Sequence, residues 1–223
     1  MKRLSGRGKQ GRKGFTLIEV VVVLAIVALL AAILTPLLIK YLDDAKIGRA
    51  KNEALVIGTA ILNFNKDTGV WPIYAAGGGG TAPPARTDAT HKVLRTNDGT
   101  NADVNSSVDA SSTGANTWNP SSNTDTYENQ LEKNTPGGST AYRTSGQFAW
   151  KGPYQSGMTG DPWGNKYYSN VEHLQPGASN RVVWVLSSGP NRQIETSYTV
   201  SATASGGAGG SEPGGDDIGF RIR

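Results

Sequence analysis

The chain has 223 residues, of which 22 are lysine or arginine and 18 are aspartate or glutamate, so its formal net charge is +4. The first 13 positions hold six of the basic residues and no acidic one. Without this segment 16 basic residues face 18 acidic ones, a net charge of −2, which argues against a nucleic-acid partner. The absence of cysteine excludes disulfide bonds and thiol chemistry. Stability must therefore come from packing, together with any metal ion that the chain binds.

An apolar run follows the basic segment, from Phe15 to Ile39, with Glu19 as its single charge. At about 25 residues, the run is long enough to cross a hydrocarbon core of roughly 30 Å as a helix. The basic residues before it favour a cytoplasmic N-terminal end. The sequence therefore predicts one transmembrane helix over 15–39, and a simple membrane anchor is the plainest interpretation of it.

The order of these segments differs from that of a secretory signal, which is cut after its apolar part. Here Gly14 and Phe15 form the junction before the apolar part, and Glu19 is the fifth residue beyond it. This pattern resembles the type III signal of type IV pilins and type II secretion pseudopilins. The resemblance implies that a prepilin peptidase removes a leader, residues 1–14, between Gly14 and Phe15, and that Phe15 is then N-methylated. The apolar helix would thus become the N-terminus of the mature protein.

Glu19 and Pro36 are unusual within such a helix. A carboxylate inside a membrane is costly and calls for a partner, and the resemblance implies that Glu19 pairs with the N-terminal ammonium, at Phe15, of a neighbouring subunit. A glutamate that reaches water at the interface is the alternative. Pro36 removes a backbone hydrogen bond and predicts a kink or local melting, such as pilin filaments use, unless it is simply tolerated. Phe15, Glu19 and Pro36 are therefore the predicted assembly residues.

The helix is expected to continue beyond the membrane as an amphipathic segment over 40–66. Apolar residues recur there at intervals of three and four, and the polar residues lie between them. The Asp67–Gly69 segment supplies a stop signal. The apolar positions are Ile47, Ala50, Ala54, Ile57, Ile61 and Phe64.

Residues 67–223 are predicted to form a globular head. A segment rich in Gly, Ser, Thr, Asn and Asp, about 76–146, predicts an exposed loop insertion with few regular elements, apart from a short helix near Tyr127 to Lys133. Four glycines at 77–80 lack the following Lys-Ser or Lys-Thr of a phosphate-binding loop. A C-terminal loop is expected over 187–223.

Aromatic and β-branched residues return between 150 and 186, where turn signals alternate with strand-like runs. They predict a small antiparallel sheet packed on the apolar face of the helix, which gives an α+β, pilin-like fold. Four segments resemble the head motifs of the major pseudopilin of type II secretion. These segments are Trp150-Lys151-Gly152-Pro153-Tyr154, Asp161-Pro162-Trp163-Gly164, Ser188-Gly189-Pro190-Asn191 and Asp216-Asp217-Ile218-Gly219.

This resemblance also implies a calcium ion that ties the loop after a head strand to an acidic C-terminal pair. Calcium prefers six to eight oxygen ligands from flexible loops. By position, Asp216 and Asp217 would supply carboxylates, Asn191 a side-chain oxygen, and Ser188 and Gln193 backbone carbonyls.

Two features depart from this pattern. Asn191 stands where an acidic ligand is usual, and the stretch from Tyr198 to Gly215 lengthens the loop before the acidic pair. Glu195 is a candidate to compensate for the lost charge. Two solvated aspartates in a mobile tail are the alternative to a metal site.

No catalytic constellation stands out: His91 and His173 are far apart in sequence and lack metalloprotease or serine-hydrolase motifs. The chain is thus expected not to be an enzyme. The resemblance implies a single-pass inner-membrane protein with its head in the periplasm, which polymerises into a pseudopilus with minor pseudopilins and an inner-membrane assembly platform. The alternatives are a surface type IV pilin and a membrane-tethered periplasmic binding protein or hydrolase.

Overall fold

A computed structural model describes residues 14–75, 90–104, 117–120, 122–138, 140–175, 181–199 and 212–223. They form two compact units, one that ends at Asp44 and one that begins at Ala45. Residues 1–13 of the predicted leader lie outside the described residues, as do parts of the predicted insertion over 76–146.

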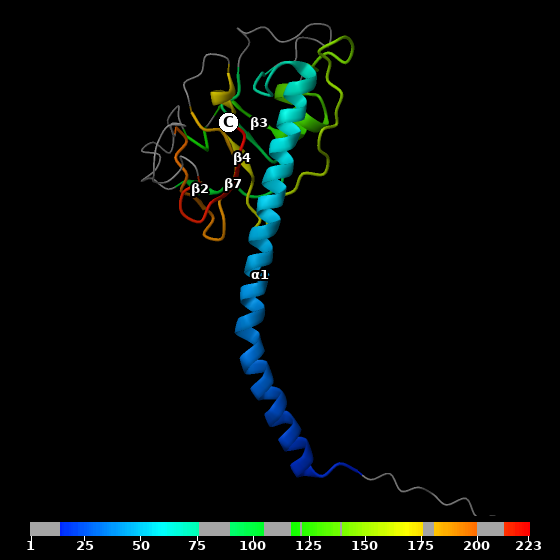
Figure 1. Cartoon of the computed structure of the whole chain (residues 1–223), viewed down its shortest axis with the longest axis vertical. Helices are drawn as coiled ribbons and strands as arrows, with labels where there is room; N and C mark the ends of the chain where they lie inside the picture. The colour runs from blue at the N-terminus through cyan, green and yellow to red at the C-terminus, as the bar shows by residue number, and fades with distance from the viewer. Residues whose placement is uncertain are drawn as a thin grey trace, which may run out of the picture. The chain divides into compact units, whose positions relative to one another are not determined.

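The first unit consists of the beginning of helix α1, Leu17–Thr68 (Figure 1). Its large apolar side chains between Phe15 and Leu42 are 47% to 82% exposed. By length and composition α1 can cross a membrane. Pro36 lies inside α1, which continues on both sides of it, so the helix is not melted at Pro36 in this structure.

The second unit contains the rest of α1, and one face of this part is buried. Gly69 ends the helix: its φ is +71°, and its N–H donates to the Asn65 carbonyl at 2.8 Å, an arrangement that suits glycine. The buried residues of this face include Ala50, Ala54, Ile57, Ile61 and Phe64, while Ile47 is half-buried. The 3.6-residue period therefore marks the face that packs on the head.

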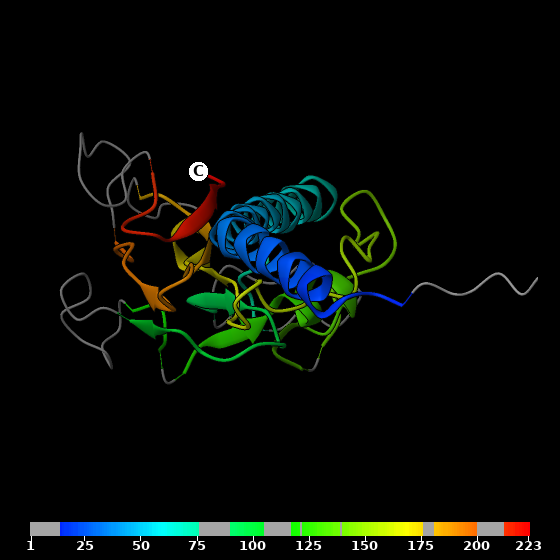
Figure 2. The ribbon, with the colours of Figure 1, turned by 90° about the horizontal axis from the view of Figure 1, so that it is seen from below.

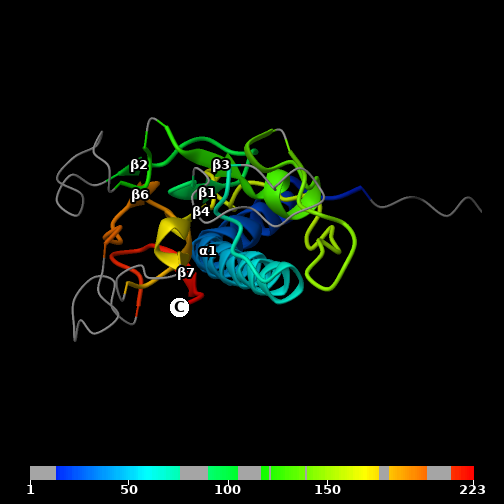
Figure 3. The same ribbon diagram turned by 90° about the horizontal axis from the view of Figure 1, so that it is seen from above.

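A five-stranded sheet in the order β3-β1-β4-β5-β7 lies beside this part of α1 (Figure 3). The β1–β3 pair is parallel and the other pairs are antiparallel, so the predicted α+β fold is confirmed, with one parallel edge pair. A separate parallel pair joins β2 and β6. The strands are β1 Val93–Arg95, β2 Asp103–Val104, β3 Thr124–Thr126, β4 Tyr168–Ser169, β5 Trp184–Ser187, β6 Gln193–Ile194 and β7 Ile218–Arg221.

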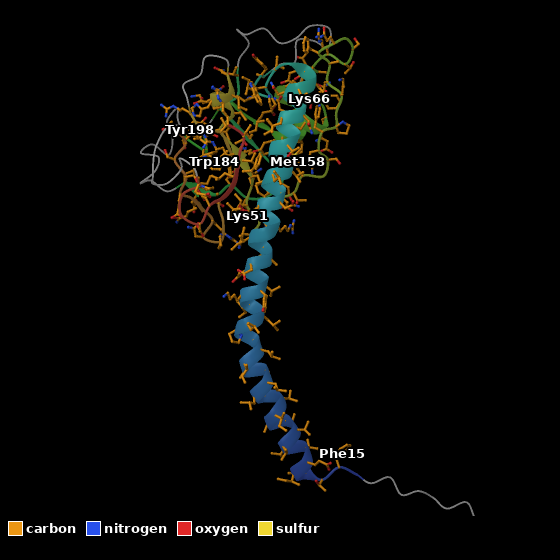
Figure 4. All side chains as sticks on the ribbon, viewed as in Figure 1. Phe15, Lys51, Lys66, Met158, Trp184 and Tyr198 are labelled. Carbon is orange, nitrogen blue, oxygen red and sulfur yellow. The ribbon has the colours of Figure 1, made fainter. Side chains whose placement is uncertain are left out.

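Neighbouring residues of a strand point to opposite sides of the sheet, and both sides are buried here. Val183 and Val185 join the core that contains Ile61 of α1, whereas Trp184 packs in a second core with Tyr198. Figure 4 shows Met158 beside the helix, and Trp184 and Tyr198 away from it. The chain must therefore cover the second face with loop segments, since α1 covers only the first.

The described parts of 76–146, where the sequence predicted an exposed loop insertion with few regular elements, include short strands and turns. They supply β1, an interior strand of the sheet, together with β2 and β3 and two short helical turns, Glu128–Glu132 and Pro136–Gly138. The first of these turns lies where the sequence predicted a short helix. A third turn, Val171–Leu174, follows β4. The predicted C-terminal loop over 187–223 likewise contains β6 and β7, and β7 pairs with β5 along the helix side of the head (Figure 2).

Polar side chains hold these short elements together. The Asp125 carboxylate on β3 accepts hydrogen bonds from Thr126 N, Asn129 Nδ2, Gln130 Nε2 and Gly137 N at 2.7 to 2.8 Å. His91 lies against the same carboxylate, 3.5 Å from its Nε2 to Asp125 Oδ2. One buried carboxylate thus satisfies four donors and connects β3 with the two helical turns, so these polar elements pack together with few apolar residues.

Burial has two opposite effects on the stability of this fold in acid. It raises the pKa of Asp217 to about 7, so protonation of this carboxyl should stabilise the folded chain as the pH falls, whereas the two buried histidines should weaken the fold. Burial lowers the pKa of both His91 and His173 from the ordinary value of 6.5. As the pH falls below this value the unfolded chain binds protons at these histidines first, so each histidine should contribute a loss of up to about 1.4 kcal/mol per pH unit to the free energy of unfolding. Thermal unfolding of the full chain in detergent, from about pH 8 to pH 5, measures the sum of these contributions, and the difference between the wild type and His91→Gln isolates that of His91. His91→Gln should lose less stability in acid than the wild type, and an unchanged pH dependence would show that His91 does not contribute.

Candidate functional site

The segment that enters α1 carries the predicted processing residues. Gly14 and Phe15 precede the helix, and the Phe15 side chain is 81% exposed. Thr16 and Glu19 form a reciprocal pair: Thr16 N–H donates to Glu19 Oε2 at 3.4 Å, and Glu19 N–H donates to Thr16 Oγ1 at 3.3 Å. This is a capping box, which satisfies donors that the first helical turn leaves free.

The capping box gives Glu19 a local role that the sequence prediction did not include. The Thr-x-x-Glu spacing of Thr16 and Glu19 was the available signal. The Glu19 side chain is exposed, and its neighbours Ile18 and Val20 are exposed and apolar. A cation from another molecule could therefore reach a carboxylate in apolar surroundings. Its pairing with the Phe15 ammonium of a second copy stays a prediction.

The acidic C-terminal pair lies in the turn before β7. Asp217 is 8% exposed, and its Oδ2 accepts three hydrogen bonds, from Glu195 N at 2.8 Å and from Thr196 N and Oγ1 at 2.6 Å. Burial raises the pKa of Asp217 to about 7 despite these donors. Thr196 is thus a structural partner of the pair that the sequence prediction missed.

Asp216 faces the loop that follows β5. Its Oδ2 accepts a hydrogen bond from Asn191 N at 3.1 Å, and its own N–H donates to Glu195 Oε2 at 3.1 Å. Burial raises the pKa of Asp216, and the nearby Glu195 carboxylate raises it further. The structure therefore brings together Asp216, Asp217, Asn191 and Glu195.

Three buried oxygens near this turn make no hydrogen bond to the part of the chain that the structure describes: Asp216 Oδ1, Asp217 Oδ1 and Ser188 Oγ. Unsatisfied buried acceptors are costly and suit a cation better than an apolar neighbour. The Asn191 amide oxygen, by contrast, accepts a bond from Gln193 N at 2.6 Å. Among the described residues no three His, Cys, Asp or Glu side chains form a metal-binding group, so an ion here would also need hydroxyl, carbonyl or water oxygens.

Comparison with known proteins bears on the N-terminal segment. Residues 9–35 match the prokaryotic N-terminal methylation motif. The chain is also similar to the fimbrial protein EcpC of Eikenella corrodens, with 41% identity over 71 residues, which is 32% of this chain and 46% of that protein. The chain thus matches less than half the length of this curated relative. No solved structure matches the chain.

These matches confirm the prepilin-type methylation motif and the likeness to a fimbrial protein, and neither description names an enzymatic activity. Each of the two histidines lies close to an oxygen atom of another residue in the head. His91 lies against Asp125, and His173 Nε2 is 3.2 Å from the Tyr198 carbonyl oxygen. The finer assignment to the major pseudopilins remains a proposal.

Proposed function

We propose that this chain is a structural subunit of a type II secretion pseudopilus. The observation that carries the proposal is an exposed apolar helix that begins within the methylation motif and has a capped glutamate in its first turn. A helix that is apolar on all sides finds a stable environment only in lipid or among similar helices. The likeness of four head segments to the major pseudopilins favours secretion.

In this proposal a prepilin peptidase cleaves between Gly14 and Phe15 and Phe15 is methylated. The subunit waits in the bacterial inner membrane with its head in the periplasm. It then polymerises with its own copies, with minor pseudopilins and on an inner-membrane assembly platform. Growth of the filament pushes folded proteins toward the outer membrane, so the chain contributes packing and performs no chemical step.

A surface type IV pilin, which serves adhesion, motility or DNA uptake, is the second candidate. The similarity to a fimbrial protein favours it. Deletion of the gene separates the two: loss of secreted enzymes with surface pili retained supports the pseudopilus, and loss of pili with normal secretion overturns it. Complementation with a Gly14→Glu variant is the matched control, since it should block cleavage and fail to restore whichever function is lost.

We also propose that the head binds calcium at the acidic turn. The three unpaired buried oxygens of Ser188, Asp216 and Asp217 fit such an ion, which would supply positive charge and tie the turn before β7 to the loop after β5. Backbone carbonyls of Ser188 and Gln193 are the further candidate ligands. Glu195, whose Oε2 accepts a bond from Asp216 N, would add negative charge near the ion without being one of its ligands. It would thereby compensate for Asn191, whose amide oxygen accepts a bond from Gln193 N.

Calcium should raise the thermal stability of the full chain in detergent. At about a hundred times Kd the gain is about 2.7 kcal/mol, or roughly 5–10 °C in Tm for a chain of this size. Asp216→Asn should remove most of the gain, whereas Asp103→Asn, on an exposed residue of β2, should keep it. Differential scanning calorimetry with calcium, magnesium or chelator measures the shift. A wild-type Tm that does not respond to calcium would overturn the proposed site.

A further inference from the structure

The Asp161–Asn165 turn, which contains the Asp-Pro-Trp-Gly motif, is organised by one buried carboxylate. Asp161 is 5% exposed, and its Oδ1 accepts hydrogen bonds from Trp163 N at 3.0 Å and Asn165 N at 2.8 Å. Two backbone bonds close the same turn, from Asp161 N to Asn165 O and from Gly164 N to Asp161 O. One oxygen of the carboxylate is therefore sufficient to shape the turn.

The second oxygen reaches a different part of the head. Asp161 Oδ2 accepts a hydrogen bond from Ser187 Oγ at 2.7 Å, and both side chains are buried. Ser187 ends β5 and pairs with Ile218 of β7, the residue after Asp217. Its Oγ in turn accepts a bond from Gly189 N at 3.2 Å. The carboxylate thus holds the start of the loop that contains Ser188 and Asn191.

The other end of this loop is held by the same turn. The Trp163 carbonyl accepts a hydrogen bond from Arg192 Nη2 at 3.1 Å, and Arg192 has a left-handed φ of +64°. Between the two ends, the loop packs tightly on Asp216: a Cβ added to Gly189, whose φ is also positive, would lie 2.2 Å from the Asp216 carbonyl oxygen. A shift of this loop would move Asn191 N away from Asp216 Oδ2, where it now donates.

We infer that Asp161 is a positioning residue for the calcium site, which acts through Ser187 to hold the loop 188–191 against Asp216 and Asp217. This inference rests on the calcium site proposed above. A buried hydrogen bond to a carboxylate is stronger than one between neutral groups, so it can fix the start of a ligand loop. Groups that orient metal ligands in this way commonly change affinity by about 10–100-fold when they are removed.

The test is the dissociation constant of calcium, measured by isothermal titration of calcium chloride into the full chain in detergent. Asp161→Asn and Ser187→Ala should each raise Kd by about ten-fold or more, and the double variant should raise it little further, because Asp161→Asn weakens and Ser187→Ala removes the same bond. Asp125→Asn is the control: this residue is also a buried, hydrogen-bonded carboxylate, but it lies on β3, at the edge of the sheet opposite β7. It should lower Tm without changing Kd.

The outcomes separate the two proposals. A wild-type chain that binds no calcium overturns the calcium site and the positioning role with it. A wild-type chain that binds, with Kd unchanged in Asp161→Asn and Ser187→Ala, overturns the positioning role alone. An equal rise of Kd in Asp125→Asn would show that general loss of stability, and not the bond to Ser187, lowers the affinity. Ser187→Ala is the milder change and serves where Asp161→Asn does not fold.

Discussion

Glu19→Gln should yield a protein that is made and inserted normally but does not assemble into filaments. Glutamine keeps the capping box with Thr16, since Thr-x-x-Gln caps as Thr-x-x-Glu does, so the start of α1 is preserved. It removes only the negative charge. In apolar surroundings a pairing with the ammonium of a neighbouring Phe15 is worth several kcal/mol, so its loss should reduce assembly by at least about ten-fold.

Thr16→Ala is the matched control for this experiment. It removes the cap and keeps the charge, at a cost of about 1 kcal/mol to the helix start. Sheared or cross-linked filaments, quantified against total subunit in the membrane, measure assembly for each variant. If Thr16→Ala abolished assembly and Glu19→Gln did not, Glu19 would act as a cap and not as a charged partner.

The parts of the molecule that the sequence predicted are those that local pattern determines. The apolar run of α1 and the spacing of Ile57, Ile61 and Phe64 follow from helix geometry, and each is visible within a few turns of chain. The glycine of the junction and the acid at Glu19 are particular residue types at a fixed spacing, so a motif could be recognised there.

The sheet could not be read in the same way, because its strands are short and their partners distant in sequence. Thr124–Thr126 has no apolar alternation, and it becomes a strand through its parallel pairing with β1 and the hydrogen bonds to Asp125. The polar sequence of this segment indicates a loop, because the sequence does not show the buried donors that bind the Asp125 carboxylate in the fold. The contact of Thr196 with Asp217 depends on tertiary structure for the same reason.

The residues proposed to bind calcium are an intermediate case. The acidic pair at 216 and 217 is visible in sequence, and in the structure Asp216 Oδ2 accepts a bond from Asn191 N in the loop after β5. The direction of Asn191 is not visible, because its side chain is free to bond within its own turn, as it does with Gln193 N. Glu195 was named as a candidate, but only the tertiary fold places its carboxylate next to Asp216.

Gly58→Ala should destabilise the head, while the same change at Gly48 should stabilise the chain. Both glycines lie in α1, where alanine is favoured over glycine by about 1 kcal/mol. A Cβ at Gly48 would meet no atom within 4 Å, but at Gly58 it would lie 2.2 Å from Cδ1 of Phe220 on β7. Overpacking of this kind costs about 1–3 kcal/mol against a helical gain of about 1 kcal/mol. The net loss of up to about 2 kcal/mol corresponds to a Tm decrease of up to roughly 8 °C.

The contact with Phe220 can be isolated by a double-mutant cycle. If the ring is what resists a Cβ at Gly58, Gly58→Ala in a Phe220→Ala background should recover the helical gain and raise Tm, as Gly48→Ala does. The same thermal unfolding assay in detergent measures all four proteins. A loss of Tm that persisted without the ring would mean that α1 and β7 approach each other through their backbones and that Gly58 serves the helix in another way. Recovery would show that the close approach of α1 to the Phe220 ring of β7 depends on the missing side chain at Gly58.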